Sequence, residues 1–300
     1  MAETNLGLMY QAGKGVPQDY SRAFYWYSKA AANNVAVAQN ALGSCYQNGW
    51  GVSADDAQAV AWFRKAADQG LPAGINNLGV MYSNGRGVPV DYAKAVELFK
   101  KSADTGNPAG QTNLGEMYIL GHGVAVDFTR GIDLFKKAAA QNYADAENDL
   151  GELYRRGLGV KQDNAEAMKW YKQGAEQDYA WSQYHVGVMY MDGDGVPQDP
   201  VQAAMWLSLA ANQGNLDARE RLASLMAASE TAKPPNTDTQ KPLKKDDVRD
   251  LLTNGVANKR IAVLVKKYGV DFSLNDDTIT DFKQLGADDE VLITISGSKK

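Results

Sequence analysis

The chain has 300 residues, with 31 basic and 36 acidic side chains, and a net charge of −5. This charge is a poor match for functions that neutralise nucleic-acid phosphates. The single cysteine, Cys45, excludes an intramolecular disulfide and a cysteine-based zinc site, and the two histidines leave little for metal or triad chemistry. No run approaches the roughly 18 consecutive apolar residues of a membrane span, so we expect a soluble protein that is not an enzyme.

A sequence repeat of 36 residues occurs six times without insertion or deletion. Its first glycine recurs at Gly7, Gly43, Gly79, Gly115, Gly151 and Gly187. The same step relates a tyrosine, two further glycines, a valine, an aspartate and an alanine of every repeat, which in the first are Tyr10, Gly13, Gly15, Val16, Asp19 and Ala31. A period of this length is typical of a solenoid built from repeated supersecondary structures.

Each repeat predicts two helices. In the first repeat, Leu6 and Met9 lie at helical spacing, and the helix ends at a Gly-x-Gly-Val turn because glycine accepts the left-handed conformation. Asp19 then stands where it caps the second helix. That helix carries an apolar stripe at i, i+3, i+4, i+7 and i+8, which comprises Ala23, Trp26, Tyr27, Ala30 and Ala31.

The glycine inside the first helix needs a compensating contact, because glycine there costs roughly 1 kcal/mol relative to alanine. Aromatic residues recur on the second helix, at the registers of Trp26 and Tyr27. We therefore expect an aromatic ring to lie across the bare backbone at Gly7 and its equivalents.

Two segments carry the clearest copies of the whole pattern, Asn77-Leu78-Gly79-Val80-Met81-Tyr82 and Trp170-Tyr171-Lys172. The pattern closely resembles the Sel1-like repeat, a relative of the tetratricopeptide repeat, over residues 1 to about 215. The resemblance implies an all-α fold, a right-handed superhelical solenoid of helix pairs that serves as a scaffold for protein–protein contacts. It also implies a bacterial source and often a place outside the cytoplasm. Cys45 alone does not fit the cysteine-rich branch of this family.

Beyond the repeats, residues 216–230 predict one more helix that caps the solenoid, so the first domain is expected to span 1–230. Residues 231–243 contain three prolines and no aromatic residue, and predict a linker. Residues 244–300 resemble a small helical module found at the C-termini of bacterial signalling proteins. Its helices are expected over 246–253, 258–268, 276–285 and 288–295, although 291–295 is β-prone in composition.

Several motifs superficially suggest a chemical site. The Gly-x-Gly-Val turns follow helices, whereas a phosphate-binding loop follows a strand, so they predict helix ends. Residues 271–281 are acidic but lack the glycine and glutamate of a calcium loop. His122 is expected to face solvent, His185 to make a polar contact between repeats, and Ser296 and Lys299 lie at a chain end. We therefore predict no catalytic residue, cofactor or metal site.

The first helices of tetratricopeptide-like solenoids line a concave groove, and the resemblance extends this expectation to the present chain. Several groove positions carry amides, and an amide offers both a donor and an acceptor to an extended peptide backbone. The alternative is that they are only short polar surface residues. The predicted partner-binding residues are Asn40, Ser44, Asn76, Val80, Thr112, Glu116, Asn148, Glu152, Tyr184 and Val188.

These observations predict a non-catalytic scaffold or adaptor that binds a protein or peptide in the groove. An alternative is an adaptor whose C-terminal module contacts nucleic acid or another surface through Lys259, Arg260, Lys266 and Lys267, although ten basic and ten acidic residues balance there and no nucleic-acid partner is expected. An enzyme is a remote alternative, because no nucleophile–base pair is evident. No signal peptide is visible, so the location is cytoplasmic if the chain is complete and extracytoplasmic if a leader was removed.

Overall fold

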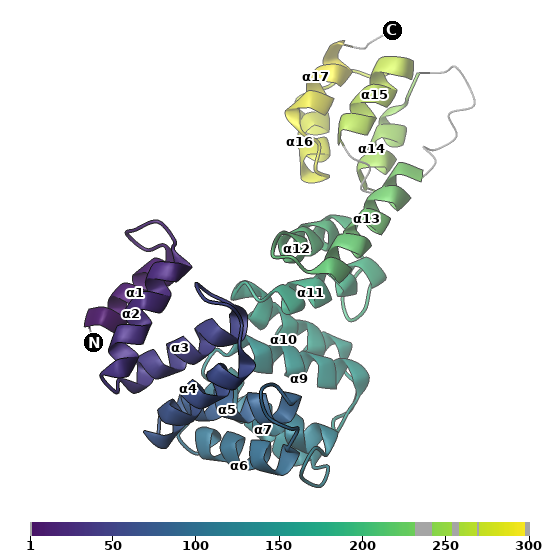
Figure 1. Ribbon diagram of the computed structural model, residues 1–300. Coiled ribbons are helices and arrows are strands. Elements are labelled where there is room, and N and C mark those ends of the chain that lie inside the picture. Colours follow the sequence, from purple (N-terminus) through teal and green to yellow (C-terminus); the bar gives the residue numbers. More distant parts are fainter. Residues whose placement is uncertain (1, 232–241, 254–257, 269, 298–300) are drawn as a thin grey trace. The chain divides into compact units, whose positions relative to one another are not determined.

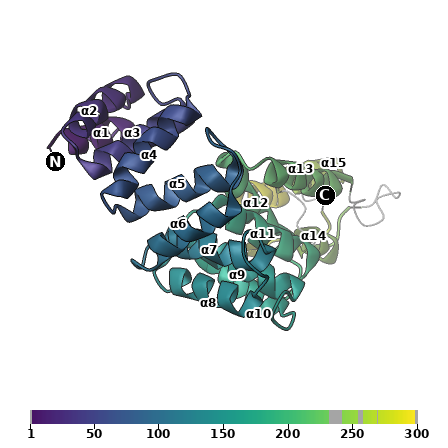
Figure 2. The ribbon, with the colours of Figure 1, turned by 60° about the horizontal axis from the view of Figure 1, so that its bottom comes forward.

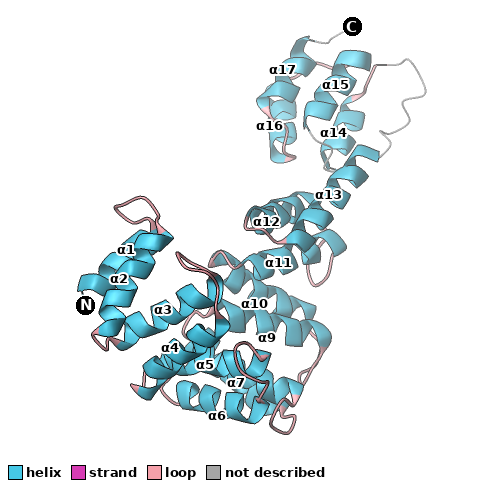
Figure 3. Cartoon of the chain, in the orientation of Figure 1, coloured by secondary structure: helices cyan, strands magenta, loops and turns pink. Residues whose placement is uncertain are grey.

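The computed structural model describes residues 2–231, 242–253, 258–268 and 270–297 (Figure 1). Most of the expected linker, together with Gly255 and Gly269, lies outside these residues. The described part is helical apart from loops and one parallel bridge between Leu243 and Val270, which confirms the predicted all-α class (Figure 3). The chain forms two compact bodies, which we call the N-terminal body (Met1–Tyr179) and the C-terminal body (Ala180–Lys300).

The N-terminal body consists of five helix pairs that follow one another in chain order (Figure 2). In each pair, the first helix precedes the glycine turn and the second follows it. The first helices are α1 (Ala2–Ala12), α3 (Ala36–Asn48), α5 (Pro72–Asn84), α7 (Pro108–Leu120) and α9 (Ala144–Arg156). The second helices are α2 (Tyr20–Ala32), α4 (Asp56–Asp68), α6 (Tyr92–Ala103), α8 (Phe128–Ala139) and α10 (Asn164–Glu176).

The two glycines of each turn have different tasks. The first ends the helix in the left-handed conformation, as at Gly85 with φ 66°. In the second to fifth repeats, the second lets the turn lie directly on the preceding repeat; a Cβ at Gly87, for example, would collide with the backbone carbonyl of Asp56. The predicted cap follows, with the Asp91 carboxylate accepting a hydrogen bond of 2.8 Å from the Lys94 backbone N–H.

The expected ring lies over the glycine of each first helix of the N-terminal body. A Cβ built on Gly79 would lie 2.7 Å from the Phe99 ring, and one built on Gly43 would lie 2.6 Å from Phe63. The covering residue belongs to the Tyr27 register of the second helix, and the Trp26 register does not supply it. Close approach within each pair therefore requires glycine at this position.

Neighbouring repeats share their cores. Buried Tyr27 and Ala30 of α2 pack in one cluster with Leu42 and Cys45 of α3. Consecutive first helices also contact each other directly, α3 with α5 and α5 with α7. In the described part of this body, consecutive second helices have fewer contacts with each other. In the middle repeats of this body, consecutive first helices are therefore closer together than consecutive second helices.

The C-terminal body begins with the sixth helix pair, α11 (Ala180–Asp192) and α12 (Pro200–Asn212), against which α13 (Leu216–Thr231) packs. Four short helices follow, α14 (Lys245–Thr253), α15 (Asn258–Tyr268), α16 (Asp276–Gln284) and α17 (Asp289–Gly297). Their shared core includes Phe282, Val291 and Ile295. The β-prone segment 291–295 is helical, because Val291 and Ile295 are one turn apart and both reach this core. The domain limits at 230 and 244 remain predictions.

Candidate functional site

The residues predicted to bind a partner lie on the first helices, and we call the surface marked by those of the N-terminal body the first-helix face. Eight belong to the N-terminal body, two on each of α3, α5, α7 and α9, and Tyr184 and Val188 belong to α11 of the C-terminal body. Asn76 and Thr112 are buried, at 6% and 4% exposure. The others are half-buried or exposed, as expected for residues that line a surface.

Two of the predicted amides hold repeats together. The side-chain N–H of Asn77 donates to the side-chain oxygen of Asn40 at 3.0 Å. The side-chain N–H of Asn113 donates to the side-chain oxygen of Asn76 at 2.8 Å. Each bond joins one first helix to the next. The side-chain oxygens of Asn40 and Asn76 are thus engaged within the protein, and the residues one turn further along, Ser44 and Val80, are half-buried.

This amide ladder is interrupted between α7 and α9, where Thr112 and Asp149 occupy the equivalent positions. The Thr112 hydroxyl donates instead to the backbone carbonyl of Pro108, at 2.9 Å. Asp149 is left with a carboxylate oxygen that is buried and has no hydrogen-bond partner. The substitution of aspartate for asparagine therefore places an unsatisfied acceptor inside the face.

The electrostatics around Asp149 follow from this burial. Desolvation raises the pKa of Asp149 to about 8, and the nearby carboxylates of Glu116 and Asp145 add to the shift. Desolvation also raises the pKa of Glu116, with Asp145 contributing. This acidic stretch favours the protonated form of Asp149 at neutral pH, and it disfavours an anionic partner.

Glu152 is already neutralised by its own helix. Arg155 pairs with it at 2.9 Å, Arg156 lies 3.6 Å away, and the Tyr171 hydroxyl donates to it at 2.9 Å. Desolvation, followed by the Glu152 charge, raises the pKa of Tyr171. The structure thus makes this predicted residue part of a charged network that spans both helices of the fifth repeat.

In the C-terminal body, the predicted residue Tyr184 lies beside α13, which the sequence predicted only as a cap. Tyr184 of α11 lines a pocket of about 550 Å³ together with Asp217, Glu220, Arg221 and Ser224 of α13. The signal was present in the repeat period, because Glu220 and Ser224 stand 36 residues after Tyr184 and Val188. Two of the residues that line this pocket therefore occupy the same register as the predicted binding residues.

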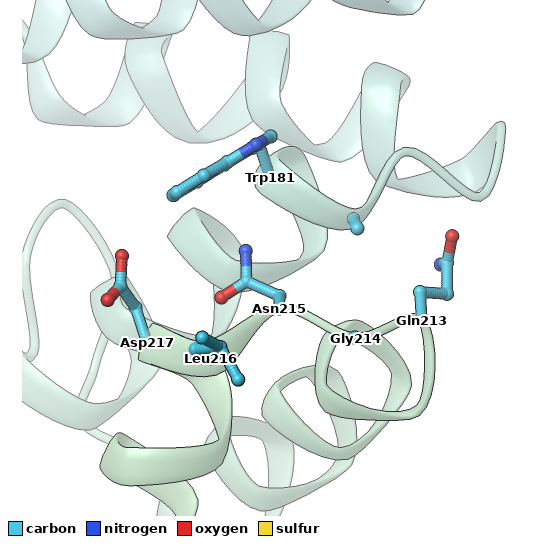
Figure 4. A pocket seen from close by; sticks show the side chains of 7 residues that line it. Trp181, Gln213, Gly214, Asn215, Leu216 and Asp217 are labelled. Carbon is cyan, nitrogen blue, oxygen red and sulfur yellow. The ribbon is translucent and has the colours of Figure 1, made fainter. Parts of the chain in front are cut away.

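A second pocket, of about 420 Å³, opens at the start of α11 and α13 (Figure 4). Trp181 forms one wall and is 47% exposed. The turn from Gln213 to Asp217 forms the rest, together with Ala180. The sequence did not point to Trp181, because no other repeat has a tryptophan at this register. It did not point to Asn215, because Asn107 is the one other asparagine at that register.

Both histidines pack against tyrosine rings. His122 was expected to face solvent, but it is half-buried and stacks on Tyr92 of the preceding repeat, with ring centroids 4.5 Å apart. The equivalent Trp50 stacks in the same way on Tyr20, at 5.6 Å. This turn position therefore joins neighbouring repeats. His185 is half-buried beside Tyr184.

The remaining candidate motifs show no arrangement for chemistry. Asn275 caps α16, accepting a hydrogen bond of 2.8 Å from the Thr278 N–H. Burial raises the pKa of the Cys45 thiol to about 11. Among described residues, no three His, Cys, Asp or Glu side chains are placed to hold a metal ion. Lys299 and the side chains of Lys259, Arg260 and Lys267 lie outside the described part.

No helix in the described ranges combines the length and the apolar composition needed to cross a membrane. This finding agrees with the absence of a long apolar run in the sequence.

Comparison with known proteins gives the same repeat boundaries. The family model described as Sel1 repeat matches residues 1–35, 36–71, 72–107, 108–143, 144–179 and 182–215. No curated protein sequence matches the chain.

Solved structures with similar folds come from bacteria. A Sel1 repeat protein from Oxalobacter formigenes is 35% identical, with a TM-score of 0.60, over 75% of this chain and 65% of that one. A protective antigen of uropathogenic Escherichia coli strains is 34% identical, with a TM-score of 0.58, over 95% of this chain and 61% of that one. The chain thus spans less than two thirds of the length of either relative.

An immunity protein from Pseudomonas aeruginosa shares the fold, with a TM-score of 0.56 at 23% identity, over 79% of this chain and 90% of that one. The six matched repeats, the helix pairs and the glycine–ring contacts lead to one assignment. The chain belongs to the Sel1 repeat family.

Proposed function

We propose that this protein is a non-catalytic scaffold that binds a protein or peptide on its first-helix face. The observation that carries the proposal is a contrast within the six repeats. Positions that build the fold are constant, such as the glycine under the ring, whereas the position one turn beyond the ladder reads Ser44, Val80, Glu116, Glu152 and Val188. The same backbone thus presents serine, valine or glutamate at this position in different repeats, which suits recognition of a specific partner.

The location of the face supports the proposal. Direct contact of α5 with α3 and with α7 brings the side chains of Ser44, Val80 and Glu116 onto neighbouring helices, so that one ligand can touch several repeats. The inner side of a solenoid also provides an extended surface, in contrast to the closed pocket that small substrates need. Membership of the Sel1 repeat family supports the same class of function.

Site-specific photo-crosslinking tests the proposal. A photoreactive residue is placed at Ser44, Val80 or Glu116, and the controls carry it at Lys100 or Lys136, which are exposed on second helices. In cells of the source organism, the face positions should each crosslink to the same protein, and the control positions should not. Crosslinking to that protein from the control positions alone would overturn the proposal.

A further inference from the structure

The pocket at the start of α11 and α13 has a well-defined aromatic wall. Trp181 exposes almost half of its surface, and Tyr184 packs edge-on against it with ring centroids 6.0 Å apart and planes at 90°. An indole ring held in this way offers its face to a ligand at little entropic cost. Electron-rich indole faces attract cations more strongly than other side chains do.

Asn215 contributes a hydrogen-bond donor that has no acceptor in the described protein. The residue is only 8% exposed, and its side-chain oxygen caps α13 by accepting a 2.8 Å bond from the Ala218 N–H. The side-chain nitrogen is buried without a partner, and it lies on the Trp181 side of the residue (Figure 4). A buried donor without an acceptor costs about 1–3 kcal/mol. Fixed by the cap, this amide is ready to donate to a carbonyl oxygen from outside.

Asp217 supplies the charge. It is exposed in the first turn of α13, and no ion pair joins it to the residues that the structure describes. Its carboxylate faces the same space as the Trp181 ring (Figure 4). Negative charge at this place offsets the positive end of the helix dipole, which would otherwise oppose a cation.

We propose that this pocket binds a lysine or arginine residue of an extended polypeptide. The cationic group lies on the Trp181 ring and pairs with Asp217, while the main-chain carbonyl of the same ligand accepts a hydrogen bond from Asn215. Chain-wide negative charge favours the approach of such a segment. The inference rests on the proposed function only in assuming a polypeptide ligand.

Nuclear magnetic resonance on the intact ¹⁵N-labelled chain tests it with small probes. The chain is titrated with N-acetyl-lysine methylamide and, separately, with N-acetyl-norleucine methylamide, whose side chain has a similar length and no charge. The readouts are the Trp181 indole N–H and the Asn215 side-chain NH₂, assigned with Trp181→Phe and Asn215→Asp. We expect saturable shifts with the lysine probe and at least tenfold weaker binding of the norleucine probe. Equal affinity for the two probes, or no saturable shift with the lysine probe, would overturn the inference.

Isosteric variants identify the groups responsible. Asp217→Asn should weaken binding of the lysine probe at least fivefold. Asn215→Asp still caps α13 but lacks the side-chain N–H, so it should lose the hydrogen bond to the probe's carbonyl oxygen. Asp192→Asn is the control, since Asp192 is exposed elsewhere on α11. Unchanged affinity in Asp217→Asn would also contradict the inference. If the probes fail while crosslinking from Ser44 and Val80 succeeds, only the basic-residue pocket is disproved and the proposed function stands.

Discussion

Asn113 on α7 donates a hydrogen bond of 2.8 Å to the side-chain oxygen of Asn76 on α5. The equivalent bond joins Asn77 to Asn40. Side chains that look available for a ligand in the sequence thus connect consecutive repeats. Asn40 and Asn76 therefore have a structural role, which makes them poor choices for variants meant to affect binding alone.

The ladder should contribute measurably to stability. Asn76→Ala removes the acceptor of Asn113 and should lower the free energy of unfolding by about 1 kcal/mol. Asn84→Ala is the control, because Asn84 is exposed at the end of the same helix. Urea denaturation of both variants checks this expectation, and equal destabilisation would show that the inter-repeat bond is not the cause.

The glycine under each ring should not tolerate a side chain. Gly79→Ala would place a Cβ 2.7 Å from the Phe99 ring, so we expect a loss of about 1–3 kcal/mol, although alanine normally favours a helix. Thermal melting measures the loss. In a Phe99→Ala background, the same substitution should cost much less, since the ring is gone. Additive losses in the double variant would contradict the packing explanation.

Asp149 should make stability depend on pH in a specific direction. Its folded pKa of about 8 is above the ordinary value near 4, so the folded protein holds a proton that the unfolded chain has released. The contribution of Asp149 to stability should therefore fall as pH rises from about 4 to 8, and then remain constant.

Asp149→Asn removes this titration and restores the residue type of Asn77 and Asn113. The variant should be more stable than the natural chain at pH 8, by about 1–3 kcal/mol, with a smaller difference at pH 5. Urea denaturation at the two pH values provides the measurement. A difference that does not change with pH would show that Asp149 is ionised in the folded protein.

Removal of the C-terminal helices tests the proposed domain limits. A chain that ends at Glu230 keeps α11, α12 and most of α13, so each repeat retains its neighbours. We expect a cooperative thermal transition by circular dichroism, close to that of the whole chain. Loss of cooperativity would mean that residues 244–300 are needed for the repeats to fold.

Much of the fold was predictable because the repeat fixes many positions together. The repeat predicted that an aromatic ring of the second helix covers Gly79, and that Asp91 begins α6 as its cap. Both features depend on contacts within one repeat. The candidate surface was less predictable because part of it depends on contacts between repeats. The hydrogen bond of Asn77 to Asn40 and the stacking of His122 on Tyr92 follow from how neighbouring repeats pack in three dimensions.

The central claim, that a protein partner binds the first-helix face, is tested most directly by titration calorimetry with the partner identified by crosslinking. The double variant Ser44→Arg/Glu116→Arg adds bulk and positive charge to the face and leaves the amide ladder intact. The control Lys100→Glu/Lys136→Glu changes exposed second-helix residues. We predict that the face variant loses at least tenfold in affinity, about 1.4 kcal/mol, and that the control loses none. Equal affinities of the face variant and the natural chain would contradict the claim.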